Sequence, residues 1–203
     1  MRKRTGEARE NRHVRPKPNS GKPNNSGQGK KSILWAEEDL LSKVESGAVS
    51  FLLILDCVQD PHNLGAILRT ADGSGVQAVV VPKDKSAGIT DTVRRISVGA
   101  ADSVPFVKVT NLARMMKSLQ SSGMWLVGTS DKAEKTLYET DLRGKLGVVI
   151  GAEGDGLRRL TEEACDFLVK LPMLGKVPCL NASVATGVCL YEAVRQRSDA
   201  PSS

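Results

Sequence analysis

Short, mostly apolar runs recur along the chain from about Val49 onward, separated by polar or glycine-rich segments. Runs of this length fit strands, and continuous apolar character is typical of strands that are covered on both faces of a parallel sheet. The runs lie at residues 51–56, 76–81, 104–109, 125–129, 146–150 and 167–173. Helical patterns fall between them, and this alternation predicts an α/β domain with a mostly parallel sheet.

The segment after the first run has the signals of a helix. Asp60-Pro61-His62-Asn63 is a turn that can cap a helix starting at Leu64. Arg69 lies about 140° round this helix from Leu64, so we expect its side chain to be off the core face. Further helices are predicted at 90–98, 111–120 and 157–164, and a last one near Asn181. The predicted core face of the first helix consists of Leu64, Ile67, Leu68 and Ala71.

Two loops that follow apolar runs are rich in glycine or proline. The run at 146–150 stops at Gly151-Ala152-Glu153-Gly154-Asp155-Gly156-Leu157, and the run at 167–173 leads into 174–185. In open α/β sheets, ligands bind where loops leave the carboxyl ends of strands. The spacing alone is equally compatible with two ordinary strand-to-helix corners.

Charge divides the chain into two parts. Residues 1–31 hold ten Lys and Arg and two Glu, a net charge of +8, whereas the remainder carries −2. With almost no large apolar residues, the first part is expected to be a disordered basic tail, and 33–46 a short amphipathic helix or docking linker. The prediction is a tail and linker at 1–45 and a compact domain at 46–203. A basic tail attracts RNA phosphates by counterion release, although it can equally be a solubilising extension.

Several classes of protein are poorly supported by the composition. No apolar run approaches the ~20 residues of a membrane span, and no signal peptide precedes the domain. The cysteines form no CxxC pair, and buried free thiols in a reducing cytoplasm are expected. With two histidines, neither a metal site nor a serine–histidine hydrolase is expected. The cysteines are Cys57, Cys165, Cys179 and Cys189.

Three blocks together resemble motifs 1, 2 and 3 of the SpoU (TrmH-like) RNA 2′-O-methyltransferases. They are Asp60-Pro61-His62-Asn63-Leu64-Gly65-Ala66-Ile67-Leu68-Arg69-Thr70-Ala71, Gly151-Ala152-Glu153-Gly154-Asp155-Gly156-Leu157 and Leu180-Asn181-Ala182-Ser183-Val184-Ala185. The resemblance covers roughly residues 50–197 and is strongest to the bacterial 23S rRNA (guanosine-2′-O-)-methyltransferase branch. That branch carries an N-terminal RNA-binding domain, and here the short basic segment stands in its place.

The resemblance implies a SPOUT fold, in which the C-terminal segment of a parallel sheet threads through a loop as a deep trefoil knot. Local sequence rules do not predict a knot. It also implies a homodimer that binds S-adenosylmethionine with backbone groups of the knot loops. The cofactor-binding residues carried over by motif position are Gly151, Leu171 and Leu180, with Thr129 and Met173 as neighbours. Glycine at 151 suits a backbone that must approach a ligand closely, whereas the sequence alone favours ordinary core positions for Leu171 and Leu180.

The catalytic residues carried over by the resemblance are Asn63, Arg69, Glu153, Asn181 and Ser183. A guanidinium hardly ever loses its proton, so Arg69 is expected to grip phosphate and hydroxyl and to stabilise developing negative charge. Glu153 and Asn63 orient Arg69 or the substrate, and Asn181 and Ser183 lie at a helix N-terminus, which can hold a phosphate. Alternatively, Asn63 and Asn181 are helix caps and Arg69 is a solvated surface charge.

The expected function is transfer of a methyl group to a ribose 2′-hydroxyl, with a guanosine of 23S rRNA as the preferred target. A tRNA 2′-O-methyltransferase and a non-catalytic RNA-binding protein that kept the fold remain alternatives. A Rossmann-type methyltransferase is disfavoured, because its glycine loop follows the first strand, whereas fewer than fifty residues follow 153–156 here.

Overall fold

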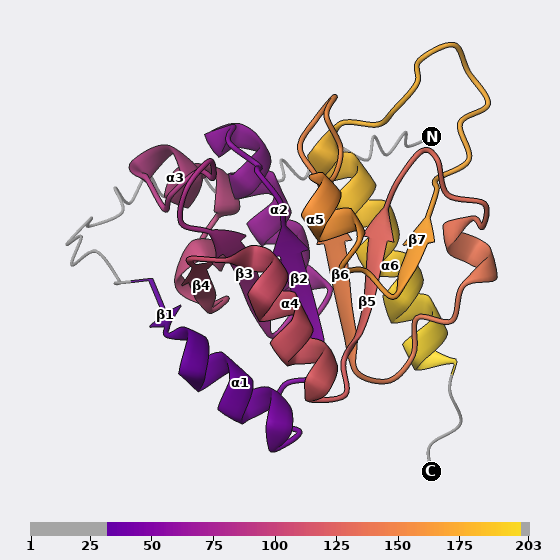
Figure 1. Ribbon diagram of the computed structural model, residues 1–203. Helices are drawn as coiled ribbons and strands as arrows, with labels where there is room; N and C mark the ends of the chain where they lie inside the picture. Colours follow the sequence, from indigo (N-terminus) through magenta and orange to yellow (C-terminus); the bar gives the residue numbers. More distant parts are fainter. Residues whose placement is uncertain (1–31, 200–203) are drawn as a thin grey trace, which may run out of the picture.

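The computed structural model describes residues 32–199, which form three layers with a parallel sheet in the middle (Figure 1). Every neighbouring pair of strands is parallel, as the sequence predicts. The strand order is β1-β4-β3-β2-β6-β5-β7. The strands are β1 (Leu34–Trp35), β2 (Phe51–Leu55), β3 (Ala78–Pro82), β4 (Phe106–Val109), β5 (Trp125–Thr129), β6 (Leu146–Ile150) and β7 (Phe167–Val169).

Helices cover both faces of the sheet because successive side chains of each strand point to opposite faces. In β2, Leu53 and Leu55 belong to one apolar cluster, whereas Leu52 and Ile54 belong to the other. The first cluster packs under α2 (Pro61–Gly73), α3 (Asp91–Ser97) and α6 (Ala182–Ser198). The second packs under α1 (Glu37–Glu45), α4 (Leu112–Ser121) and the short α5 (Arg159–Glu162). Two 3-10 turns, Ala100–Asp102 and Leu137–Glu139, complete the elements.

The start of α2 differs from the expectation in a way that matters for the site. The helix begins at Pro61, and Asp60 is its N-cap, accepting hydrogen bonds from the backbone N–H groups of His62 (2.9 Å) and Asn63 (3.3 Å). Proline at the first helical position fits, because that N–H would have no partner in any case. The expected start at Leu64 and the interpretation of Asn63 as a cap are therefore wrong, and the Asn63 amide is available for other contacts.

The segment that the sequence groups with the tail is built into the sheet. β1 pairs with β4, and the backbone N–H of Phe106 donates to the carbonyl of Ile33 (2.8 Å). The predicted amphipathic helix is present as α1, whose Leu40 and Val44 are fully buried. The packed unit therefore extends across the predicted boundary at 45/46 to the first described residues. The basic segment 1–31 lies outside the described residues.

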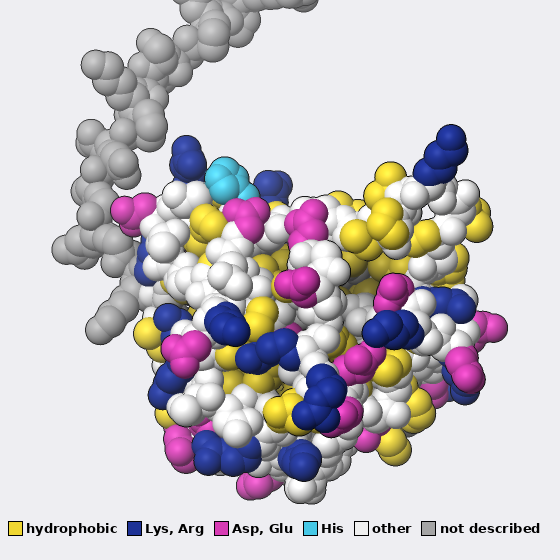
Figure 2. All heavy atoms as spheres, turned by 45° about the horizontal axis from the view of Figure 1, so that its top comes forward, with side chains coloured by type: hydrophobic (Ala, Val, Ile, Leu, Met, Phe, Trp, Pro, Cys, Tyr) yellow, Lys and Arg dark blue, Asp and Glu magenta, His cyan; other side chains and the backbone are white. Residues whose placement is uncertain are grey.

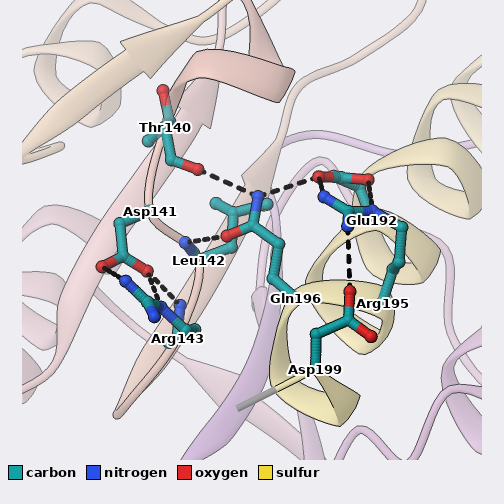
Figure 3. A network of polar contacts seen from close by, with 8 residues as sticks. All are labelled: Thr140, Asp141, Leu142, Arg143, Glu192, Arg195, Gln196 and Asp199. Carbon is teal, nitrogen blue, oxygen red and sulfur yellow. Dashed lines mark hydrogen bonds and ion pairs between the residues drawn. The ribbon is translucent and has the colours of Figure 1, made fainter.

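The connection from β5 to β6 is fastened to the last helix by a polar network (Figure 3). The Gln196 side chain accepts a hydrogen bond from the backbone N–H of Leu142 (2.9 Å) and donates to the carbonyl of Thr140 (3.1 Å). It also donates to Glu192 (2.8 Å), which in turn binds Arg195. A single amide thus joins α6 to a loop more than fifty residues earlier in the sequence.

Candidate active site

The candidate site lies at the carboxyl edge of β2 and β6, two strands that are neighbours in the sheet and far apart in the sequence. The chain builds the sheet outward on one side of β2 through β3 and β4, then crosses to the other side for β5 and β6. Loops from β2 and β6 therefore diverge at this point. Such switch points are where open α/β sheets bind ligands.

Three of the predicted catalytic side chains meet here. Asn63 on α2 donates from Nδ2 to Glu153 Oε2 (3.2 Å), and Asn181 Nδ2 donates to Asn63 Oδ1 (3.0 Å) and Glu153 Oε2 (3.3 Å). Each residue comes from a different one of the three motifs. The cluster fixes one carboxylate oxygen between two amides, at a half-buried to exposed position where a substrate can reach it.

The N-terminus of α6 adds Ser183 to this cluster. Asn181 is the N-cap of α6, and its Oδ1 accepts hydrogen bonds from the backbone N–H (2.9 Å) and the hydroxyl (2.6 Å) of Ser183. The interpretation of Asn181 as a helix cap is therefore correct, and it is compatible with a role in the site. The cap uses the oxygen, while the amide nitrogen holds Asn63 and Glu153.

Arg69 is exposed and stands apart from the cluster. Its position off the apolar face of α2 agrees with the prediction, since Leu68 beside it is buried and Arg69 is not. Six residues separate it from Asn63, which is about 9 Å along a helix. Within residues 32–199 its side chain makes no hydrogen bond or ion pair. The guanidinium is therefore free to bind an external anion.

Gly151 is required by the loop itself. A Cβ atom at this position would lie 2.2 Å from the backbone carbon of Gly156 and 2.5 Å from the nitrogen of Leu157. The loop folds back as a tight hairpin in which Ala152 and Gly156 exchange backbone hydrogen bonds of 3.0 and 3.1 Å. Close approach of the chain's own backbone thus explains the glycine, whereas close approach of Gly151 to a ligand stays a prediction.

An ion pair that the sequence patterns do not predict anchors the end of this loop. Asp56 follows β2 and is fully buried. It accepts hydrogen bonds from Arg158 Nε (2.7 Å) and the Arg158 backbone N–H (2.9 Å), and the guanidinium Nη2 lies 2.6 Å from Oδ1. This pairing raises the pKa of Arg158. An acidic residue at the end of a buried strand was the available signal in the sequence.

The predicted cofactor-binding residues lie on loops from three adjacent strands. Thr129 ends β5, Gly151 follows β6, and the other three lie on the long loop from β7 to α6, which projects from the sheet at the upper right of Figure 1. In the described part of the chain, residues 171–180 make no backbone hydrogen bond. The backbone N–H and C=O groups of this loop are therefore open to a ligand. The three loop residues, Leu171, Met173 and Leu180, are all half-buried.

Positively and negatively charged side chains are mixed around this edge of the molecule. On the face in Figure 2, lysine and arginine side chains are interspersed with aspartate and glutamate, and hydrophobic side chains gather at the upper right. Within residues 32–199, no group of three or more His, Cys, Asp and Glu is placed to hold a metal ion. The same range contains no helix that is long and apolar enough to span a membrane.

The four cysteines are free thiols of differing exposure. Cys189 in α6 is fully buried, and burial raises the pKa of its thiol to about 12. Cys165 is half-buried, and burial likewise raises its pKa to about 12. Cys179 on the loop before α6 is exposed. The expectation of free thiols is confirmed, but that of burial holds fully for Cys189 alone among the four.

Comparisons with known proteins identify the family to which this chain is similar. Residues 50–191 match the SpoU rRNA Methylase family. The 23S rRNA (guanosine-2′-O-)-methyltransferase RlmB of Pseudomonas aeruginosa is 59% identical over 170 residues, which are 82% of this chain and 68% of that protein. RlmB of Xanthomonas campestris pv. campestris is 61% identical over 165 residues, or 81% and 66% of the two chains.

A solved structure supports the same assignment. The SpoU methyltransferase AviRb from Streptomyces viridochromogenes, in complex with the cofactor AdoMet, superposes with a TM-score of 0.68 at 32% identity, covering 74% of this chain and 59% of that chain. The chain spans about two thirds of the length of the two RlmB relatives. The family match, in contrast, covers well over half of this chain and contains all three motifs. The chain therefore belongs to the SpoU rRNA methylase family.

Proposed function

We propose that this protein transfers a methyl group from S-adenosylmethionine to the ribose 2′-hydroxyl of a guanosine in 23S rRNA, in the cytoplasm. The observation that carries the proposal is the cluster of Asn63, Glu153 and Asn181, which joins three motifs at the switch point of the sheet. The RlmB relatives are named for this reaction on 23S rRNA, whereas no contact of the site favours tRNA or a non-catalytic role.

The site residues fit the demands of an oxygen nucleophile. Glu153 Oε2 is held by two amides, and within residues 32–199 its Oε1 accepts no hydrogen bond, so it is open to a ribose hydroxyl. Arg69 grips a phosphate of the target and stabilises negative charge that develops on the oxygen. Ser183, at the N-terminus of the 17-residue α6, holds a phosphate or ribose oxygen.

The loops at this edge fit S-adenosylmethionine. Backbone groups of Gly151 and of the loop 171–180 supply unpaired donors and acceptors, and the half-buried Leu171 and Leu180 supply apolar surface. Thr129 at the end of β5 and Met173 on the loop after β7 complete the proposed set of cofactor-binding residues. When bound, the cofactor supplies a methyl group activated by a sulfonium. The chain's part is to hold the ribose hydroxyl in line with that methyl group and to exclude water.

A trefoil knot is part of the proposal. It is supported by contacts of the loop between β5 and β6 with two later segments. This loop binds the chain just after β7, through Leu137 N–H to the Lys170 carbonyl and Lys170 N–H to the Lys135 carbonyl, both 3.0 Å. The same loop binds α6 through Gln196 (Figure 3). These contacts hold both later segments against the loop that, in a trefoil knot, the chain must thread. Tracing the backbone in a crystal structure tests it.

We also propose a homodimer. Val184 and Tyr191 lie seven residues apart on α6, hence on one face, and are 52% and 53% exposed. The Tyr191 hydroxyl reaches over Gly73 at the end of α2, so the two helices present a joint surface. Sedimentation velocity should give a dimer for the wild type and a monomer for Tyr191→Lys. A monomeric wild type at micromolar concentration contradicts this part of the proposal.

The reaction is tested with an unmodified 23S rRNA transcript, S-adenosylmethionine labelled in its methyl group, and the full chain. A methylated ribose resists alkaline cleavage, so the expected result is label incorporation with one guanosine becoming resistant. Glu153→Gln should lose most of the activity, whereas Glu163→Gln, at the exposed residue that follows α5, should keep it. No incorporation, or incorporation on a base, would refute the proposal. A tRNA transcript in the same assay tests the alternative substrate.

A further inference from the structure

A cavity of about 380 Å³ lies beside the candidate site. It is formed by the loop after β2, the loop after β3 and the hairpin after β6. Cavities of 300–1,000 Å³ are typical of small-ligand sites, and this one is close to the lower end, where a single base or nucleoside fits. Its lining includes Cys57, Gln59, Lys85, Asp155, Leu157 and Arg158.

One hairpin joins the cavity to the catalytic cluster. Ala152 and Gly156 form the base of the hairpin, with Glu153, Gly154 and Asp155 between them. Glu153 contacts Asn63 and Asn181, whereas Asp155, two residues later, lines the cavity. A nucleotide whose ribose lies against Glu153 can therefore place its base in the cavity.

The charged groups of the cavity are not equally available. Arg158 is paired with the buried Asp56, so its side chain is held in place as part of the cavity wall. Within residues 32–199, in contrast, the side chains of Gln59, Lys85 and Asp155 make no hydrogen bond or ion pair. The cavity thus offers one ammonium donor, one carboxylate acceptor and one amide that can be either. Leu157 and the thiol of Cys57, whose pKa is raised by burial, provide an uncharged wall for the face of a ring.

This set of groups matches guanine better than adenine. Guanine presents acceptors at O6 and N7, which Lys commonly contacts. Its N1–H and N2–H₂ are adjacent donors, which together suit a carboxylate. Adenine has an acceptor at N1 and lacks the exocyclic amine at C2, so it would turn a lone pair toward Asp155. Enzymes that act on a single nucleotide commonly take its base out of the stack and read this edge in a pocket.

We propose that the cavity binds the guanine base of the target nucleotide, with Asp155 accepting hydrogen bonds from N1–H and N2–H₂ and Lys85 donating to O6. Asp155 is then a specificity-determining residue that contacts the substrate, and the Asp56–Arg158 pair is a positioning device for the cavity wall. This inference rests on the proposed function, because it names the part of the site that selects the nucleotide.

The test compares Asp155→Asn with Asp84→Asn in single-turnover methylation at subsaturating RNA. Asp84 is also exposed, neighbours Lys85 and does not line the cavity, so its substitution matches the change in charge. Transcripts carry guanosine, inosine or adenosine at the nucleotide mapped by the assay above. Asp155→Asn should lower the rate on guanosine about ten- to a hundredfold, which is the usual value of one bidentate base contact. The rate of Asp84→Asn should stay near that of the wild type.

Two further results separate recognition from a general defect. Wild type should prefer guanosine to inosine, which lacks the N2 amine, and Asp155→Asn should bring the rates on the two substrates close together. Calorimetry should give unchanged S-adenosylmethionine binding for both variants. If Asp155→Asn keeps the wild-type ratio of guanosine to inosine, the inference is overturned while the proposed function stands. If the wild type methylates no RNA, the proposed function fails and this inference with it.

Discussion

Substitution of Arg158 by alanine should destabilise the protein far more than its surface position suggests. Asp56 is fully buried, whereas the Arg158 side chain is 46% exposed. The variant leaves the Asp56 carboxylate in the interior with one remaining donor, the backbone N–H of residue 158. Removing one partner of a buried pair costs about 3–5 kcal/mol, and the retained N–H and nearby solvent reduce this here to about 2–4 kcal/mol.

Urea unfolding followed by circular dichroism measures this loss, with Arg159→Ala as the matched control. Arg159 is the next residue and also forms an ion pair, 2.7 Å from Glu163, but both side chains are exposed. Exposed pairs of this spacing contribute about 0.3–0.5 kcal/mol, so the control should stay close to the wild type. The double variant Asp56→Ala/Arg158→Ala should be more stable than Arg158→Ala alone, because no unpaired charge remains. If Arg158→Ala unfolds within ~1 kcal/mol of Arg159→Ala, the reasoning about the buried carboxylate is wrong.

Three further results are expected. Arg69→Ala should abolish methyl transfer yet keep the melting temperature, because its exposed side chain leaves no cavity; near-normal activity in the labelled-methyl assay would contradict its role. Deletion of residues 1–31, which carry a net charge of +8, should weaken the salt dependence of RNA binding. In filter binding, the slope of log K against log salt should fall by roughly 0.7–0.9 for each phosphate that the shorter chain no longer binds. Equal slopes with and without the segment would assign RNA binding to the folded part. A thiol reagent at pH 8 should label exposed Cys179 within minutes and spare Cys189 until the protein unfolds, since a thiol of pKa about 12 stays protonated; mass spectrometry of the labelled peptides decides.

The sequence predicts the elements that its apolar runs define. β5 and β6 occur at the expected residues, and β2 ends one residue before its predicted end. These predictions succeed because strands that are buried on both faces of a parallel sheet have nearly continuous apolar sequences. The sequence does not predict β1, because this strand is only two residues long and is held by backbone pairing with β4. Backbone pairing leaves no pattern of side chains in the sequence. The start of α2 was misplaced because both Asp60 and Asn63 can cap, and the choice depends on what Asn63 contacts in the folded chain.

The candidate site could be predicted from the motifs but not from local patterns. Asn63 lies 90 residues from Glu153 and 118 from Asn181, and no periodicity connects them. The resemblance to a family supplied that connection. The Asp56–Arg158 pair spans 102 residues and lies outside the residues carried over from the motifs, so only the three-dimensional arrangement identifies it.

The position of β2 in the middle of the sheet has a consequence for the chain while it is being synthesised. β2 pairs with β3 on one side and with β6 on the other, but β3 begins at Ala78 and β6 at Leu146. At 5–20 residues per second, β6 leaves the ribosome about 3–14 s after β3. During this interval the side of β2 that will pair with β6 is an open, apolar strand edge, which can pair with other chains. Asn181 emerges later still, so the catalytic cluster can assemble only after β6 has become available to cover this edge.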